Sequence, residues 1–110
     1  MITIDIYEDK FTGLVKKYKV SGHADSAKAG EFDTVCALVS MTTQIPILGL
    51  ERHLQHKISY ETDEVEGILF VELVDAPTEL TEAILRTMCY GLTELQENFK
   101  EFIRIQKHRR

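Results

Sequence analysis

A chain of 110 residues with 44% hydrophobic content can bury one core and is too short for two ordinary domains, so a single domain over residues 1–110 is expected. The 18 acidic and 13 basic residues give a formal net charge of −5, which argues against a general nucleic-acid binder. No stretch reaches the ~20 apolar residues of a bilayer span and the N-terminal MITIDIYED lacks a basic leader segment, so we expect no membrane segment and a cytoplasmic protein.

The first part of the chain predicts an antiparallel hairpin. Isoleucine occupies every second position of residues 2–6, which is the period of a strand with one buried face. Turn-forming residues follow at 10–13, and a second strand is expected over residues 14–21. The hairpin therefore ends just before His23, and the mostly small or polar residues 24–32 predict a mobile loop.

A helix is expected next, over residues 34–54. Asp33 is a good N-cap, and the apolar pattern begins at Val35. Pro46 lies inside this helix, where proline removes one backbone hydrogen bond and crowds the preceding turn. We therefore expect a kink or break near residues 42–45, with a separate short helix beyond it.

The second half of the chain predicts another hairpin and no cofactor site. Strands are expected over residues 59–62 and 67–74, joined by a solvated acidic turn at 63–66. His53 and His56 lie before it, but no third or fourth ligand follows at a spacing that suits a metal. We predict neither a metal nor another cofactor.

A last helix is predicted from Pro77 to about residue 106, because its apolar residues keep helical spacing. Such a helix is roughly 40 Å long at ~1.5 Å per residue, which is more than one small domain covers. Either Gly91 interrupts it or its end packs on a second copy of the chain, so a homodimer is expected. The basic residues 107–110 are interpreted as a frayed tail.

The element order is thus strand, strand, helix, strand, strand, helix. This order predicts an α/β domain of two layers, in which the apolar face of a sheet packs against the helices. The pairing of strands between the two halves cannot be read from the periodicity.

The candidate chemistry lies in residues 20–39, which contain one histidine and one cysteine. His23 follows a strand and Cys36 lies at the start of a helix, so two rigid elements can present them to one cleft. A thiolate nucleophile and an imidazole that shares its proton are the reactive pair of cysteine proteases. The positive end of the helix dipole stabilises a thiolate at Cys36, although a capping carboxylate on Asp33 would oppose it.

Each of these residues also has a structural interpretation. Cys36 alone resembles a small buried hydrophobic residue, and Gly22 with His23 resembles a turn. Asp33 is an N-cap or a group that orients the pair. Cys89 lies in an apolar helical pattern and is interpreted as packing, and two cysteines without a Cys-x-x-Cys pair fit a reducing compartment.

A wider motif surrounds the histidine and the cysteine. It consists of Gly22-His23-Ala24 and, after a short loop, Asp33, Val35-Cys36-Ala37 and Val39-Ser40. This motif resembles the signature of the ribosomal-processing cysteine protease (Prp) family, and the chain also has that family's size and element order. The resemblance implies a catalytic pair of His23 and Cys36, with Gly22, Asp33 and Ser40 as supporting positions.

The resemblance also implies a substrate. Members of the family are small bacterial proteins that remove a short N-terminal extension from large ribosomal subunit protein number twenty-seven, so the precursor of that protein is the expected partner. This sequence departs from the family in having Asp25 where a glycine is frequent and Leu38 where a second alanine is common. Neither departure removes a reactive group.

The mechanism expected from these residues is acyl transfer. His23 assists formation of the Cys36 thiolate, which attacks a peptide carbonyl, and water then releases the acyl-enzyme. Amides at the helix start, with Gly22, are the expected oxyanion donors, and Ser40 bonds either within the cleft or back to the helix. The alternatives are a non-catalytic ribosome-associated module that binds a peptide and, more weakly, a thiol-redox protein that uses Cys36 alone.

Overall fold

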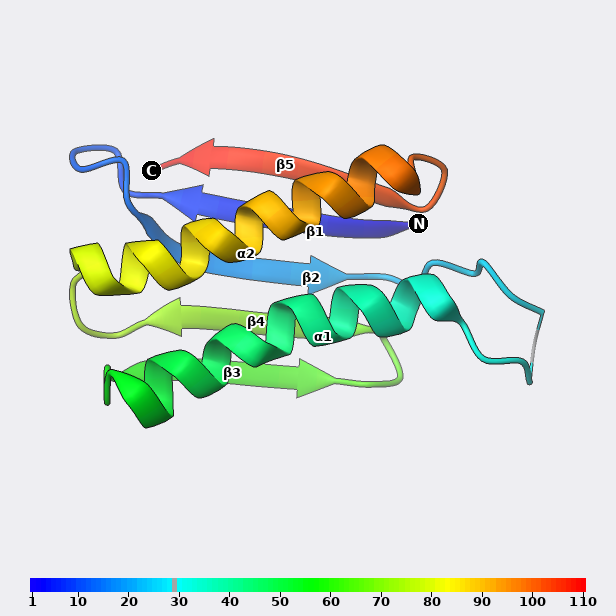
Figure 1. Cartoon of the computed structure of the whole chain (residues 1–110), viewed down its shortest axis with the longest axis horizontal. Helices are drawn as coiled ribbons and strands as arrows, with labels where there is room; N and C mark the ends of the chain where they lie inside the picture. The colour runs from blue at the N-terminus through cyan, green and yellow to red at the C-terminus, as the bar shows by residue number, and fades with distance from the viewer. Residues whose placement is uncertain (29) are drawn as a thin grey trace.

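The computed structural model describes residues 1–28 and 30–110 and has two layers (Figure 1). One layer is a five-stranded sheet, and the other is a pair of helices that lie across one face of it. The strands are β1 (Ile2–Glu8), β2 (Val15–Ser21), β3 (Ile58–Asp63), β4 (Ile68–Leu73) and β5 (Ile103–Arg109). The helices are α1 (Thr34–Leu48), which runs directly into the π-helical segment η1 (Gly49–His53), and α2 (Glu79–Asn98). The predicted two-layer α/β class is confirmed.

The strands follow the order β3-β4-β2-β1-β5 across the sheet. Both predicted hairpins are present, since β1 pairs antiparallel with β2 and β3 pairs antiparallel with β4. The hairpins join through β2 and β4, which pair antiparallel with Val20 opposite Leu69. This join places the end of β2, where His23 follows, beside the turn that connects β3 to β4.

The core lies between the sheet and the two helices. Alternate residues of the central strands face the helices, which is the pattern expected for a sheet with one covered face. The buried hydrophobic residues of β1, β4, α1 and α2 include Ile2, Ile4, Ile6, Leu69, Val71, Leu73, Val35, Val39, Ile47, Leu85, Met88 and Leu92. Cys89 belongs to the same cluster, in agreement with its interpretation as a packing residue.

The C-terminal segment differs from the sequence prediction. The expected helix to residue 106 and the frayed basic tail were wrong, because α2 ends at Asn98 and β5 follows it, parallel to β1. The backbone at Phe99 is no longer helical, with φ −133° and ψ 49°. Strand β5 gives the outer edge of β1 a full set of backbone partners and buries Ile103. The backbone hydrogen bonds and the burial of Ile103 stabilise the strand more than the few further apolar residues at helical spacing would stabilise a longer helix.

Helix α2 is also uninterrupted at Gly91. Gly91 lies where the two helices meet, and a Cβ there would lie 3.5 Å from Cγ2 of Thr42. Because α2 has 20 residues and no overhanging end, the reason given for a homodimer no longer holds.

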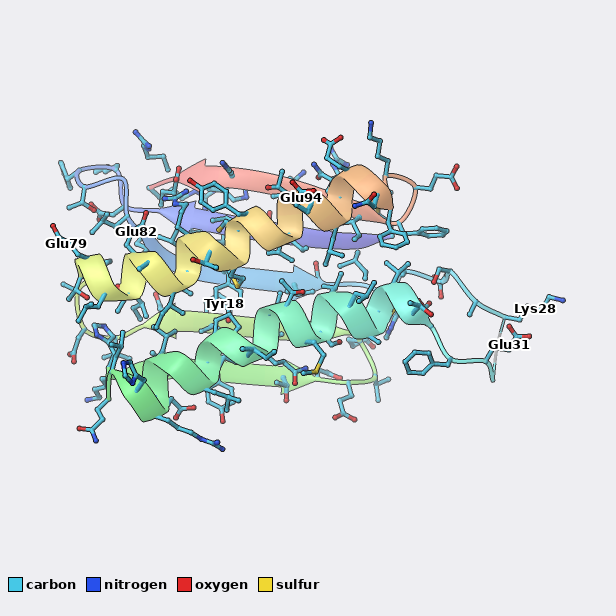
Figure 2. All side chains as sticks on the ribbon, viewed as in Figure 1. Tyr18, Lys28, Glu31, Glu79, Glu82 and Glu94 are labelled. Atoms are coloured by element: carbon cyan, nitrogen blue, oxygen red, sulfur yellow. The ribbon has the colours of Figure 1, made fainter. Side chains whose placement is uncertain are left out.

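Helix α1 continues through Pro46 as far as Leu48, so the break expected near residues 42–45 is absent. The helix changes character at Gly49, where η1 begins. Proline has no N–H for the carbonyl four residues earlier, and the neighbouring carbonyl of Thr43 accepts a 2.7 Å hydrogen bond from the buried hydroxyl of Tyr18. Figure 2 shows Tyr18 reaching from β2 toward the helix layer. A side chain of the sheet therefore supports the helix backbone at this point.

The segment Thr34–His53 is more apolar than the sequence analysis allowed. By length and composition, its 20 residues are sufficient to cross a membrane, so the statement that no stretch reaches a span was wrong. The core helix of a globular protein passes the same test, and Val35, Val39 and Ile47 of this segment are buried against the sheet.

Candidate active site

A groove with a volume of about 620 Å³ lies between α1, the end of β2 and the β3–β4 hairpin. Four of the five predicted site residues line it, namely Gly22, His23, Cys36 and Ser40. The fifth, Asp33, is the N-cap of α1. The fold thus brings the histidine and the cysteine to the wall of one groove.

Cys36 lies in the first turn of α1 and is half-buried. Its Sγ accepts a hydrogen bond of 3.3 Å from the backbone amide of Ala24, the residue after His23. The amide N–H is directed at the sulfur, and Cys36 lies at the positive end of the helix dipole. The contact also shows that the chain just after His23 lies against the Cys36 sulfur.

Asp33 caps the helix and anchors the preceding loop. Its Oδ1 accepts a 3.0 Å hydrogen bond from the Cys36 amide, and its Oδ2 accepts one of 2.9 Å from the Ser26 amide. The Ser26 hydroxyl also donates to Oδ1. The hydrogen bond from the Ser26 side chain, followed by that from the Cys36 backbone, lowers the pKa of Asp33 to about 2. Asp33 therefore acts as the N-cap that the sequence predicted, and it fixes the start of the helix that carries Cys36.

The His23 ring is exposed and contacts the β3–β4 turn. Its Nε2 lies 3.0 Å from the carbonyl oxygen of Val65. The turn is itself held by a 3.1 Å hydrogen bond from the Glu66 amide to Oδ1 of Asp63. The acidic run is a turn, as predicted, and it also touches the candidate base.

Two glycines with positive φ allow this contact. Gly22 has φ +92°, and a Cβ on it would lie 2.4 Å from the carbonyl oxygen of Met1. Gly67 has φ +66°, and a Cβ on it would lie 2.5 Å from the Gly22 carbonyl oxygen and 3.0 Å from Cε1 of His23. No Cβ fits at such distances, so both positions require glycine.

The remaining predicted features are Ser40 and the loop. Ser40 is exposed on the groove wall, and within the described residues its hydroxyl makes no back-bond to the Cys36 carbonyl. The predicted loop 24–32 includes residue 29, which lies outside the described residues. Asp25 has φ +54°, a conformation that aspartate tolerates and glycine prefers, which explains how it stands at a position where glycine is frequent.

The backbone groups of the site are not predictable from residue types. The Ala24 amide and the Val65 carbonyl are backbone groups, which almost every residue type at these positions would provide. The only signal in the sequence is Gly67, a glycine after the acidic run, which is typical of a tight turn. The outer face of α1 was not predicted either. On this face Met41, Ile45 and Leu48 are exposed and line the groove opposite Tyr60 of β3. The sequence predicted only that these residues are helical. Which side of the helix faces the groove depends on the position of β3, and the strand pairing could not be read from the sequence.

A cysteine at a helix start and a histidine on the same groove are the functional groups of a cysteine-dependent hydrolase. Comparison with known proteins makes this class specific. The family model described as Cysteine protease Prp matches residues 1–104. The chain belongs to this family, and the protein is a cysteine protease.

Individual relatives agree with the family match. Ribosomal processing cysteine protease Prp from two strains of Staphylococcus aureus is 32% identical to this chain over 111 residues, covering 96% of this chain and 97% of the relative. The structure of the S. aureus Prp protease with a covalently linked product peptide superposes with a TM-score of 0.88 at 28% identity, covering 97% of this chain and 99% of the other. The same protease with a substrate peptide gives a TM-score of 0.85 at 27% identity, with the same coverage.

Proposed function

We propose that this protein is a ribosomal-processing endopeptidase that removes a short N-terminal extension from large ribosomal subunit protein number twenty-seven and so supports ribosome assembly. The observation that carries the proposal is the shared groove of His23 and Cys36 in a chain of the Prp family. The relatives from S. aureus bear the name ribosomal processing protease, and one of them was solved with a substrate peptide.

The proposed reaction is acyl transfer through Cys36. His23 takes the thiol proton, and the sulfur attacks the carbonyl carbon of the scissile bond. The imidazolium then gives its proton to the leaving amine as the C–N bond breaks, which leaves a thioester on Cys36. Water, deprotonated by the same histidine, hydrolyses the thioester and restores the thiol.

One oxyanion donor is proposed beyond those expected from the sequence. The amides of Cys36 and Ala37 at the helix start already donate to Asp33, at 3.0 and 3.1 Å. The amide of Ala24 donates to the sulfur instead, so it lies next to the carbon that the sulfur would attack. We assign the Ala24 amide as an oxyanion donor, because it can turn from the sulfur to the oxygen as charge moves there.

The groove suits an extended peptide with apolar side chains. Met41, Ile45 and Leu48 project from α1 toward it and are about half exposed, and Tyr60 is exposed on the facing strand. Burial of such residues by a peptide is favourable at roughly 25 cal/mol per Å² of apolar surface. Glu51 and Glu64 add negative charge to the lining, which favours a basic segment in the substrate.

The test is cleavage of the purified ribosomal protein with its N-terminal extension, followed by mass spectrometry. Wild type is expected to make a single cut, while Cys36→Ala and His23→Ala reduce the rate at least 100-fold, because positioned proton transfer alone contributes about 100- to 10,000-fold. Circular dichroism of both variants serves as the folding control. Equal cutting by all three proteins would place the chemistry elsewhere, and tight binding without cutting would favour the peptide-binding module.

Location and assembly are further parts of the proposal. We place the protein in the cytoplasm, where its ribosomal substrate is made and where the free Cys36 and Cys89 stay reduced. A homodimer stays a prediction, now without its original reason. Light scattering of the full chain would measure it. No direct binding of nucleic acid is proposed, given the net charge of −5.

A further inference from the structure

We propose that the β3–β4 turn positions the catalytic base: the main-chain carbonyl of Val65 holds the His23 ring with its proton on Nε2, which leaves Nδ1 as the atom that takes the proton from Cys36. This inference rests on the catalytic roles proposed above for His23 and Cys36. It adds a positioning residue that lies 42 positions away from the histidine in the sequence.

The assignment of the ring proton follows from the chemistry of the contact. A carbonyl oxygen only accepts hydrogen bonds, so the nitrogen 3.0 Å from the Val65 oxygen must be the donor. A neutral imidazole carries one proton, and with that proton on Nε2 the free lone pair is on Nδ1.

The position of the sulfur agrees with this choice of base atom. Nδ1 is the ring nitrogen nearer to the backbone of its own residue, whereas Nε2 is at the far end of the ring. The Cys36 sulfur lies 3.3 Å from the amide nitrogen of Ala24, against the backbone that directly follows His23. The sulfur and Nδ1 therefore lie toward the same backbone, while Nε2 reaches the turn.

The turn is built to make this contact with its backbone. The Val65 side chain is 84% exposed, so only the carbonyl of this residue is used. The bond between the Glu66 amide and Asp63 fixes the turn, and Gly67 allows it to approach the Gly22 carbonyl and the His23 ring. A side chain at Gly67 has no space, and adding one must move the turn away from the histidine.

Gly67→Ala is the first test, with Gly13→Ala as its matched control. Both glycines have positive φ, +66° and +75°, so both variants carry the same kind of backbone strain. At Gly13 a Cβ meets only the flexible end of Arg109, at 3.5 Å. Gly67→Ala is expected to lower kcat roughly tenfold while KM stays within about twofold, since the base is retained but no longer oriented. Gly13→Ala is expected to keep both constants.

The second readout is the tautomer of His23, read from ¹⁵N and ¹H NMR of the ring in a Cys36→Ala background, where no thiolate pairs with the imidazole. The expected spectrum has the proton on Nε2, in a signal that Gly67→Ala removes and Gly13→Ala preserves. The Cβ added at Gly67 also meets Cε1 of His23, at 3.0 Å, so variants of Asp63, which add no bulk, separate loss of the Val65 contact from displacement of the ring itself. A proton on Nδ1, or a Gly67→Ala protein that loses activity while keeping the Nε2 proton, would overturn the proposal.

A second pair of variants avoids added bulk if Gly67→Ala does not fold. Asp63→Ala removes the acceptor that holds the Glu66 amide, whereas Asp63→Asn keeps an acceptor and removes the same charge. The Ala variant is expected to lose the Nε2 signal and the Asn variant to retain it, and an identical loss in both would overturn the proposal. Failure of wild type to cleave the substrate would overturn the proposed function, whereas cleavage by His23→Ala would overturn the catalytic role of His23 and with it this inference. The NMR spectrum reports the tautomer independently of both.

Discussion

At the scale of single residues, Asp33 joins the loop before α1 to the first turn of that helix. One carboxylate accepts hydrogen bonds from the Ser26 amide and hydroxyl and from the Cys36 amide. The loop before the helix and the first turn of α1, which carries Cys36, therefore share one anchor. Asp33 thus fixes the start of the helix that carries Cys36, and its carboxylate also interacts with the Cys36 side chain.

Asp33→Ala is expected to lower the free energy of unfolding by about 1 kcal/mol, the usual cost of losing an N-cap, as measured by urea denaturation near neutral pH. Alkylation of Cys36 by iodoacetamide should change in rate as well, because the helix start that presents the sulfur loosens. A variant with unchanged stability would show that the cap contributes little.

The titration of Asp33 predicts an acid dependence with a definite sign. Its pKa is about 2 in the folded protein and about 4 in an unfolded chain, so the unfolded state binds the proton more readily. The stabilisation by the Asp33 carboxylate is present above about pH 4 and is lost as pH falls from there through about 2. Asp33→Asn keeps a capping oxygen but cannot titrate, so its stability should fall less over this range. Parallel curves for the two proteins would contradict the assignment.

At the scale of elements, the contact between β2 and α1 holds the proline-containing helix on the sheet. The Tyr18 hydroxyl, fully buried, donates to the Thr43 carbonyl one turn before Pro46. Burial is also what raises the pKa of Tyr18, so this phenol stays protonated and remains a donor.

Tyr18→Phe is expected to lower the free energy of unfolding by about 1 kcal/mol, because the Thr43 carbonyl is left without this partner. Tyr90→Phe is the control, since Tyr90 is exposed on α2 and should tolerate the change within about 0.5 kcal/mol. Equal stabilities of the two variants in urea would mean that the buried hydrogen bond contributes nothing net.

At the scale of the whole molecule, the last strand joins the end of the chain to its beginning. Strand β5 pairs in parallel with β1 along its length, from Ile2 opposite Ile103 to Glu8 opposite Arg109. A parallel pair needs a crossover between its strands, and here the remainder of the fold supplies it. Strand β1 is therefore an interior strand, and β5 and β3 form the two edges of the sheet.

The burial pattern of β5 gives a prediction that a C-terminal helix or frayed tail would not. Ile103→Ala is expected to lower the free energy of unfolding by about 2–5 kcal/mol, and Arg104→Ala by less than about 0.5 kcal/mol, because alternate residues face the core and the solvent. Thermal and urea unfolding of both variants measure this difference. Similar effects at the two positions would contradict the strand.

Much of the site was predictable because its side-chain chemistry is local in sequence. The local signals are the alternating isoleucines of β1, the capping aspartate before α1 and the short spacing from Gly22 to Cys36. The structure brings four of the predicted residues to one groove, namely Gly22, His23, Cys36 and Ser40. The end of the chain was not predictable in the same way. Phe99 and Phe102 continue the helical spacing, whereas the strand that follows them is stabilised by its pairing with β1.

The sequence by itself thus determined the elements whose own residues carry their pattern and the family of the chain, and it predicts His23 and Cys36 as the reactive pair. Only the tertiary structure decided the order of the strands, the formation of β5 and the contact between His23 and the Val65 carbonyl. The physical reason is that these features depend on backbone hydrogen bonds between segments far apart in the chain. A backbone carbonyl or amide is the same in every residue, so its partner is chosen by the packing of the whole sheet.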